Sequence, residues 1–290
     1  MKSRVLILVG IVLLMGVLVA GCSRANQESS TSPNTVMAAP VNVVVSILPQ
    51  ADFVKRIGGE QVKVAVMIPP GANPASYEPT PDQLKDLAHA ALYLQVGRLP
   101  FEEAWMDRIK SANPDMLIID TSQSIAVVNN NPHIWLSPRL VKIQAENIYQ
   151  ALVQVDPHHR AQYQEGYRGF VQQLDALDEE ITGTLAEVKG RTFIVYHPAW
   201  GYFASDYGIK ELAIEGEGKE PGARELSAIV AQASAAGIKN IFASPQHSTR
   251  SAETLAREMG GKVLLIDPLP RDYIKSMKEN AQVLAQGMGN

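Results

Sequence analysis

Cysteine is almost absent from this 290-residue chain, which contains only Cys22. A disulfide bond within the chain is therefore excluded, and so are zinc or iron–sulfur sites that need several thiolates. Aromatic residues account for 6% of the chain and charged residues for 19%, whereas hydrophobic residues account for 46%. This composition is too apolar and too varied for a disordered or fibrous protein, so we expect a sizeable buried core.

A surplus of positive charge is also missing. Lys and Arg total 26 against 30 Asp and Glu, which gives a formal net charge of −4, and no stretch concentrates the basic side chains. Nucleic-acid-binding domains carry a basic patch, so we expect no nucleic-acid partner. The sequence also lacks the His-Glu-x-x-His motif that pairs a metal with a general base. The composition therefore favours a protein that binds a small ligand.

The first residues have the parts of an export signal. Lys2 and Arg4 precede an apolar run that ends in Leu-Val-Ala-Gly before Cys22, and this ending resembles the bacterial lipoprotein box. The run is shorter than the ~20 residues of a membrane span, which disfavours a retained transmembrane anchor. We predict a signal peptide over 1–21 and a lipid on Cys22, which would tether the protein to a membrane outside the cytoplasm. The polar segment 22–40 is predicted to be a flexible tether.

Beyond residue 40, strand and helix patterns alternate. Runs of β-branched residues at 41–48 and 62–68 are typical of strands buried in a parallel sheet, and a helix pattern begins at Pro81. Further strands are predicted at 92–96, 116–120, 192–196, 211–214, 240–243 and 263–266, and further helices after Pro138 and over 223–236 and 251–259. This alternation predicts an α/β fold.

The middle of the chain predicts one long helix. Over 156–190, apolar side chains recur at gaps of three and four, which indicates an amphipathic helix of roughly 50 Å. Gly166, Gly169 and Gly183 would each weaken it by about 1 kcal/mol relative to Ala, so packing must stabilise it.

The domain organisation follows from this helix. We predict an N-terminal α/β lobe over 41–155 and a C-terminal α/β lobe over 191–290, each with a parallel sheet, joined by the rigid helix 156–190. A single rigid connection implies limited closure of the lobes, with the binding cleft between them. We expect a monomer.

Several candidate metal ligands lie where strands end. His197 and His247 each follow a predicted strand, and Asp267 ends the last one. Because ligands collect at the carboxyl ends of parallel strands, these side chains could bind a divalent transition metal. His133, which precedes a helix of the first lobe, could add a ligand from across the cleft. Taken alone, His133 beside Trp135 also fits a buried structural imidazole, and Asp267 before a proline fits a turn cap.

Four segments together resemble the zinc- and manganese-binding solute-binding proteins of ABC importers, the group related to the zinc receptor of enteric bacteria. The segments are Ile68-Pro-Pro-Gly-Ala-Asn-Pro through Pro81, Asn131-Pro-His-Ile-Trp-Leu-Ser-Pro138, His197-Pro-Ala-Trp-Gly-Tyr-Phe-Ala204 and Ile266-Asp-Pro-Leu269. The resemblance covers nearly the whole chain from residue 41. It implies a receptor in the cell envelope that captures zinc, in preference to manganese, and delivers it to an ABC permease. A metal-dependent hydrolase and a lipid-anchored adhesin of the same fold are the alternatives.

The resemblance also implies a ligand set. His133 and His197 match two family histidines, and Asp267 matches the C-terminal carboxylate. A further family histidine falls at Ala75, which cannot coordinate a metal. Nitrogen at position 197, where manganese members carry a carboxylate, favours zinc.

Four candidates could replace the missing histidine. They are a water or buffer anion, His247, Asn73 and Glu78. His247 would complete a set of three histidines and one carboxylate that suits zinc, although a surface imidazole is an equally good interpretation of it. The Gly-rich charged stretch 215–220 is predicted to be a solvated connection, not a phosphate-binding loop, because it lacks the Lys-Ser/Thr of a P-loop.

Overall fold

The computed structural model describes residues 39–216 and 222–289. The predicted signal peptide, Cys22 and nearly all of the predicted tether lie outside the described residues. One compact body begins at Ala39. Within the described ranges, no helix combines the length and the apolar character needed to cross a bilayer.

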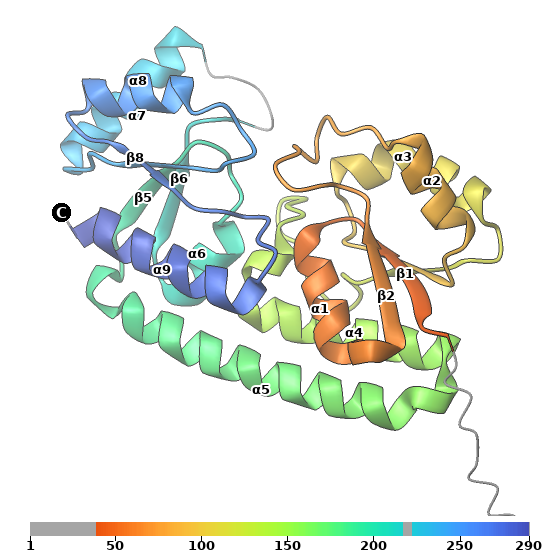
Figure 1. Ribbon diagram of the computed structural model, residues 1–290. Coiled ribbons are helices and arrows are strands. Elements are labelled where there is room, and N and C mark those ends of the chain that lie inside the picture. Colours follow the sequence, from red (N-terminus) through yellow and green to blue (C-terminus); the bar gives the residue numbers. More distant parts are fainter. Residues whose placement is uncertain (1–38, 217–221, 290) are drawn as a thin grey trace, which may run out of the picture. The chain divides into compact units, whose positions relative to one another are not determined.

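The first half of the body is built on a four-stranded parallel sheet with the order β2-β1-β3-β4 (Figure 1). The strands are β1 (Val41–Val45), β2 (Val62–Val66), β3 (Leu92–Gln95) and β4 (Leu117–Asp120). The helices are α1 (Leu48–Gly58), α2 (Pro81–Ala88) and α3 (Pro100–Ala112). The β-branched run of β1 lies between two partner strands, with Val43 paired to Val64 on one side and to Leu92 on the other.

The second half repeats this arrangement, with the order β6-β5-β7-β8 and all neighbours parallel. Its strands are β5 (Thr192–Val195), β6 (Lys210–Ala213), β7 (Ile241–Ala243) and β8 (Val263–Leu265). Its helices are α6 (Gly201–Tyr207), α7 (Ala223–Ala235), α8 (Arg250–Glu258) and α9 (Tyr273–Gly289). The α/β class and the two parallel sheets are confirmed. Because all strands within each sheet are parallel, their carboxyl ends lie along one edge of that sheet. Ligands of α/β proteins bind at this edge.

Two consecutive helices connect the halves. Helix α4 (Pro138–Val155) is capped by Ser137, whose Oγ accepts a hydrogen bond from Leu140 N at 3.1 Å. Helix α5 (Arg160–Thr184) follows and packs against α4, α1 and α9, so that it touches both halves (Figure 1). Its apolar face is fully buried and consists of Tyr163, Phe170, Leu174, Leu177 and Ile181.

The long helix is shorter than the sequence predicted. Its 25 α-helical residues span about 38 Å, and 3₁₀ turns at 157–159 and 186–188 occupy the two ends of the predicted range. At the start, Pro157 has no backbone N–H, and the Asp156 carboxylate accepts a hydrogen bond from His159 Nδ1 at 2.6 Å. Such tightened turns are common where helices end.

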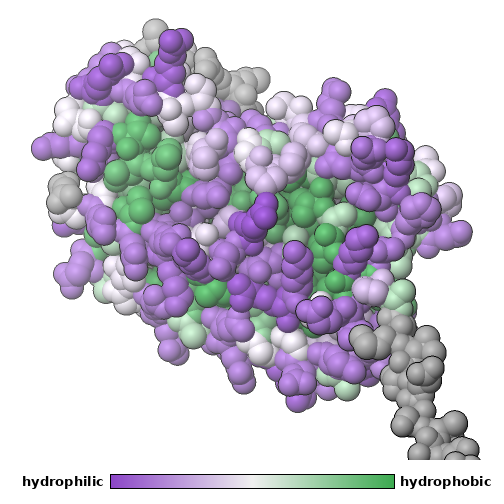
Figure 2. Space-filling model, in the orientation of Figure 1, coloured by the Kyte–Doolittle hydropathy of each residue, from purple (hydrophilic) through white to green (hydrophobic). Residues whose placement is uncertain are grey.

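The larger of two hydrophobic clusters reaches both sheets, and the smaller one packs within the second half alone. Buried side chains from the two halves form a continuous cluster that includes Trp135, Trp200, Phe203 and Tyr273. Trp135 Nε1 donates a buried hydrogen bond to Pro268 O at 2.6 Å, which joins the first half directly to the second. Polar side chains cover much of the face shown in Figure 2, with apolar areas between them.

Two glycines of α5 predict opposite effects on stability. A Cβ at Gly166 would collide with the backbone carbonyl of Ile57 in α1, whereas a Cβ at Gly169 would meet no atom within 4 Å. We expect Gly166→Ala to lower the free energy of unfolding by about 1–3 kcal/mol through overpacking. Gly169→Ala should raise it by about 0.5–1 kcal/mol because Ala favours the helix. Urea unfolding of the two variants checks this, and equal effects would contradict the close helix contact.

Candidate metal centre

Four polar residues line up along one edge of the second sheet. Each lies in the loop that follows a strand: Glu215, His197 and Asp267 two residues after β6, β5 and β8, and His247 four residues after β7. Because the strand order is β6-β5-β7-β8, the same order holds along the edge. The topology therefore places His197 between Glu215 and His247, and Asp267 at the far end.

Three imidazoles meet at this edge. The rings of His197 and His247 stack with centroids 4.8 Å apart and an interplanar angle of 21°. His133 approaches from the first half, immediately before the 3₁₀ turn Ile134–Leu136, and its ring centroid lies 5.4 Å from that of His197 at 75°. The structure thus brings together all three histidines that the sequence singled out.

Two of the imidazoles are oriented by oxygen atoms behind them. His133 Nδ1 lies 2.7 Å from Asn131 Oδ1, which also accepts the His133 backbone N–H at 3.0 Å. His197 Nδ1 lies 3.1 Å from Glu215 Oε2. Since carboxamide and carboxylate oxygens only accept hydrogen bonds, Nδ1 carries the proton in each ring. The Nε2 atoms are then left with a free lone pair, which is the form that binds a metal.

Burial favours the neutral form of two of the site histidines, His133 and His247. Burial lowers the pKa of His133 to about 3, and the neighbouring His197 and His247 add to the effect. Burial also lowers the pKa of His247, helped by His197 and opposed by Glu215. A neutral imidazole is required of a metal ligand, so these residues are ready to bind at neutral pH.

The histidines share a cavity of about 730 Å³. Its wall includes Ala75 and Asn73, so the residue at the position of the family histidine does face the site. Asn73 Oδ1 accepts a hydrogen bond from Ala75 N at 2.9 Å. Glu78 is exposed and does not line this cavity.

Tyr202 forms two hydrogen bonds with the segment that contains Asn131, the hydrogen-bond partner of His133. Its hydroxyl accepts a hydrogen bond from Val128 N at 3.0 Å and donates one to Asn131 O at 3.0 Å. Tyr202 belongs to α6 of the second half, while the segment 128–131 precedes His133 in the first half. The orientation of His133 therefore depends on a contact across the two halves.

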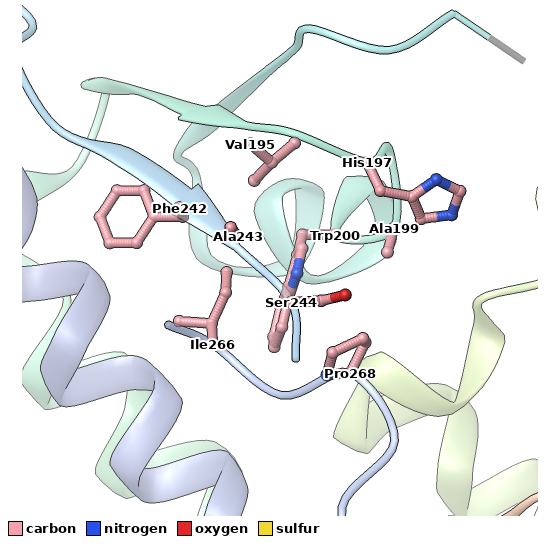
Figure 3. A pocket seen from close by; sticks show the side chains of 9 residues that line it. All are labelled: Val195, His197, Ala199, Trp200, Phe242, Ala243, Ser244, Ile266 and Pro268. Carbon is pink, nitrogen blue, oxygen red and sulfur yellow. The ribbon is translucent and has the colours of Figure 1, made fainter. Parts of the chain in front are cut away.

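A small second cavity of about 10 Å³, with space for about one water molecule, lies behind His197 (Figure 3). The side chains around it come from the end of β5, the segment between β5 and α6, the end of β7 and the segments that follow β7 and β8. Ser244 Oγ, which lines both cavities, is buried and has no hydrogen-bond partner in the described part of the chain. Gln246 Oε1, whose residue lines the larger cavity, is also buried without a hydrogen-bond partner among the described residues. Polar atoms without partners suit a place where water or a ligand binds.

Asp267 is the predicted ligand that the structure does not bring to the histidines. Its Oδ1 accepts hydrogen bonds from Gln246 Nε2 at 2.8 Å and from Leu269 N at 2.9 Å, and it does not line the larger cavity. Over residues 39–216 and 222–289, no group of three or more His, Cys, Asp or Glu side chains is arranged to hold a metal ion. The carboxylate and the imidazoles are neighbours along the sheet edge without forming a closed coordination shell.

Glu215 is the site residue that sequence reasoning missed. The prediction of a solvated loop beginning at this position is wrong for Glu215, whose side chain is only 11% exposed and contacts His197. Its glycine-rich surroundings suggested a flexible connection. Its spacing gives a better signal, because it comes two residues after its strand, as His197 and Asp267 do after theirs.

Comparison with known proteins identifies the family. The model of the zinc-uptake complex component A family (ZnuA, periplasmic) matches residues 43–287. The chain belongs to this family. The high-affinity zinc uptake system protein ZnuA of Bacillus subtilis (strain 168) is 26% identical, over 93% of this chain and 94% of that protein.

Solved structures agree in fold. A crystal structure of a ZnuA deletion mutant with zinc bound is 39% identical, covers 86% of this chain and 98% of its own, and has a TM-score of 0.82. The laminin-binding protein of Streptococcus agalactiae, described as a bifunctional protein with adhesin and metal-transporting activity, is 27% identical. It covers 85% of this chain and 98% of its own with a TM-score of 0.78. The predicted resemblance to zinc receptors is confirmed, and ZnuA-family proteins are transport components outside the cytoplasm, not enzymes.

Proposed function

We propose that this protein captures a zinc ion outside the cytoplasm and delivers it to the permease of an ABC importer. The observation that carries the proposal is the meeting of His133, His197 and His247 in one cavity, with two of the rings preset to offer Nε2. His133 comes from one half of the body and the other two from the second half. An ion bound by all three would sit between the lobes.

The donor set favours zinc over manganese. Imidazole nitrogens suit zinc, whereas manganese prefers carboxylate and other oxygen ligands. Zinc is typically bound by four ligands, so one more donor is needed beside the three imidazoles. We propose that Asp267, the neighbouring carboxylate along the sheet edge, fills this role through Oδ2 once its side chain turns toward the histidines, since both hydrogen bonds of its carboxylate end on Oδ1. His247 takes the place of the histidine that Ala75 replaces.

The proposed location follows from the N-terminal sequence. A lipid on Cys22 would anchor the chain to a membrane, and the segment up to residue 40 would let the monomeric body reach the permease. The matched family is described as periplasmic, which agrees with a place in the cell envelope.

Calorimetric titration of the purified, chelator-treated protein tests the function. We expect one zinc ion per chain and much weaker binding of manganese, because three of the four donors are nitrogen. Magnesium, which prefers oxygen ligands, serves as the negative control. Failure to bind zinc, or manganese binding as tight as zinc binding, would contradict the proposal.

A further inference from the structure

Glu215 is held firmly beside the metal site. Backbone hydrogen bonds from Ile214 N to Val195 O (2.9 Å) and from Glu215 N to Tyr196 O (2.8 Å) extend the pairing of β6 with β5 past the last strand residue. The backbone of Glu215 is therefore fixed against Tyr196, the residue that precedes His197. A position fixed in this way is suited to orient a neighbouring side chain.

The side chain of Glu215 has one described partner. It pairs with His197 Nδ1 at 3.1 Å, and no Lys or Arg within residues 39–216 and 222–289 forms an ion pair with it. A largely buried carboxylate without a cationic partner is costly, because burial removes the water that would solvate its charge. A divalent cation held on the other side of His197 would supply the missing positive charge.

We propose that Glu215 is a positioning residue of the metal site, whose carboxylate accepts the Nδ1–H of His197, aims Nε2 at the captured cation and contributes negative charge to its binding. This inference rests on the proposed zinc-binding function. A carboxylate behind a ligating histidine fixes the tautomer of the ring and makes its other nitrogen a stronger donor.

The two oriented histidines differ in the charge of the group that accepts their Nδ1–H. His133 receives the same geometrical support from Asn131, but the acceptor there is a neutral amide oxygen. The charged acceptor instead supports His197, the ring that contacts both other imidazoles. Glu215 therefore acts on the central member of the group.

The test compares Glu215→Ala, Glu215→Gln and Glu215→Asp with the wild type. Zinc affinity is measured by competition with a chromophoric chelator. We expect Glu215→Ala to bind zinc about 10–100-fold more weakly, which is the usual cost of losing such a partner. Glu215→Gln keeps an acceptor and loses the charge, so its affinity should be intermediate, and Glu215→Asp should recover part of the loss. Glu258→Gln, which removes an exposed charge of the same half, should bind like the wild type.

A spectroscopic measurement separates positioning from a merely structural effect. Long-range ¹H–¹⁵N spectra of the metal-free protein report which nitrogen of His197 carries the proton. We expect the Nδ1–H form in the wild type and Glu215→Gln, and a mixture of tautomers in Glu215→Ala. Wild-type zinc affinity and an unchanged tautomer in Glu215→Ala would overturn the role of Glu215 and leave zinc capture standing. A wild-type protein that binds no zinc would overturn both.

Discussion

Replacing His133, His197 or His247 by alanine is expected to weaken zinc binding by roughly 100–1000-fold. Structural zinc sites bind with about 10–16 kcal/mol in total, so each of four ligands accounts for roughly 3–4 kcal/mol. The ring of His197 contacts the rings of both other histidines, so removing any one of the three would leave the zinc ion with one ligand fewer. Titration with zinc in competition with a chelator measures the loss for each variant.

His247→Ala is the variant that decides the ligand set, because the family resemblance accounts for the other two histidines and not for this one. His158→Ala is the matched control, since it removes one exposed imidazole far along the sequence from the site. If His247→Ala bound zinc like the wild type while His197→Ala did not, His247 would be excluded and a water molecule would be the replacement for the lost family ligand.

Replacing Ala75 by histidine is expected to tighten zinc binding by about 10–100-fold. Ala75 lines the cavity that the three imidazoles share, so an imidazole at this position would lie within that cavity. Because zinc typically takes four ligands, the added imidazole would replace the Asp267 carboxylate, so the gain is only part of the roughly 3–4 kcal/mol of a full ligand, and ordering the exposed loop lowers it further. The same chelator competition measures it, and dissociation of zinc should slow in proportion.

The double variant Ala75→His with His247→Ala tests the compensation directly. If His247 compensates for the residue at position 75, restoring the histidine there should return the affinity of His247→Ala to near that of the wild type. Ser76→His adds an imidazole one residue away, on the same exposed loop, as a control for unspecific metal binding. Equal tightening by Ser76→His and Ala75→His would contradict a specific position for the missing ligand.

Most of the framework could be predicted from the sequence because parallel strands and amphipathic helices have clear periods. The strand runs, the buried face of α5 and the alternation of the two halves all follow from the spacing of apolar residues. Helix α9 has a buried face with the same period, at Tyr273, Met277, Ala281 and Leu284. The ends of α5 were not predictable, since α and 3₁₀ turns share nearly the same apolar spacing.

Strand order was the information that the sequence could not supply. The spacing showed that His197, His247 and Asp267 follow strands, but not which strands are neighbours. Only the order β6-β5-β7-β8 places Glu215 beside His197 and separates His197 from Asp267 by one strand. The competing hydrogen bonds that Gln246 and Leu269 make to Asp267 are likewise products of the folded loops.

The link from Tyr202 to the segment 128–131 has a consequence for unloading. With one hydrophobic cluster reaching both sheets, wide separation of the halves would expose large aromatic side chains such as Trp135 and Trp200 to water, at a cost of several kcal/mol. Breaking the two hydrogen bonds of one tyrosine hydroxyl is far less costly, and it would release the loop that holds Asn131 against His133. A transporter that pulled on this loop could loosen one imidazole, and so discharge the ion, while the rest of the receptor kept its shape.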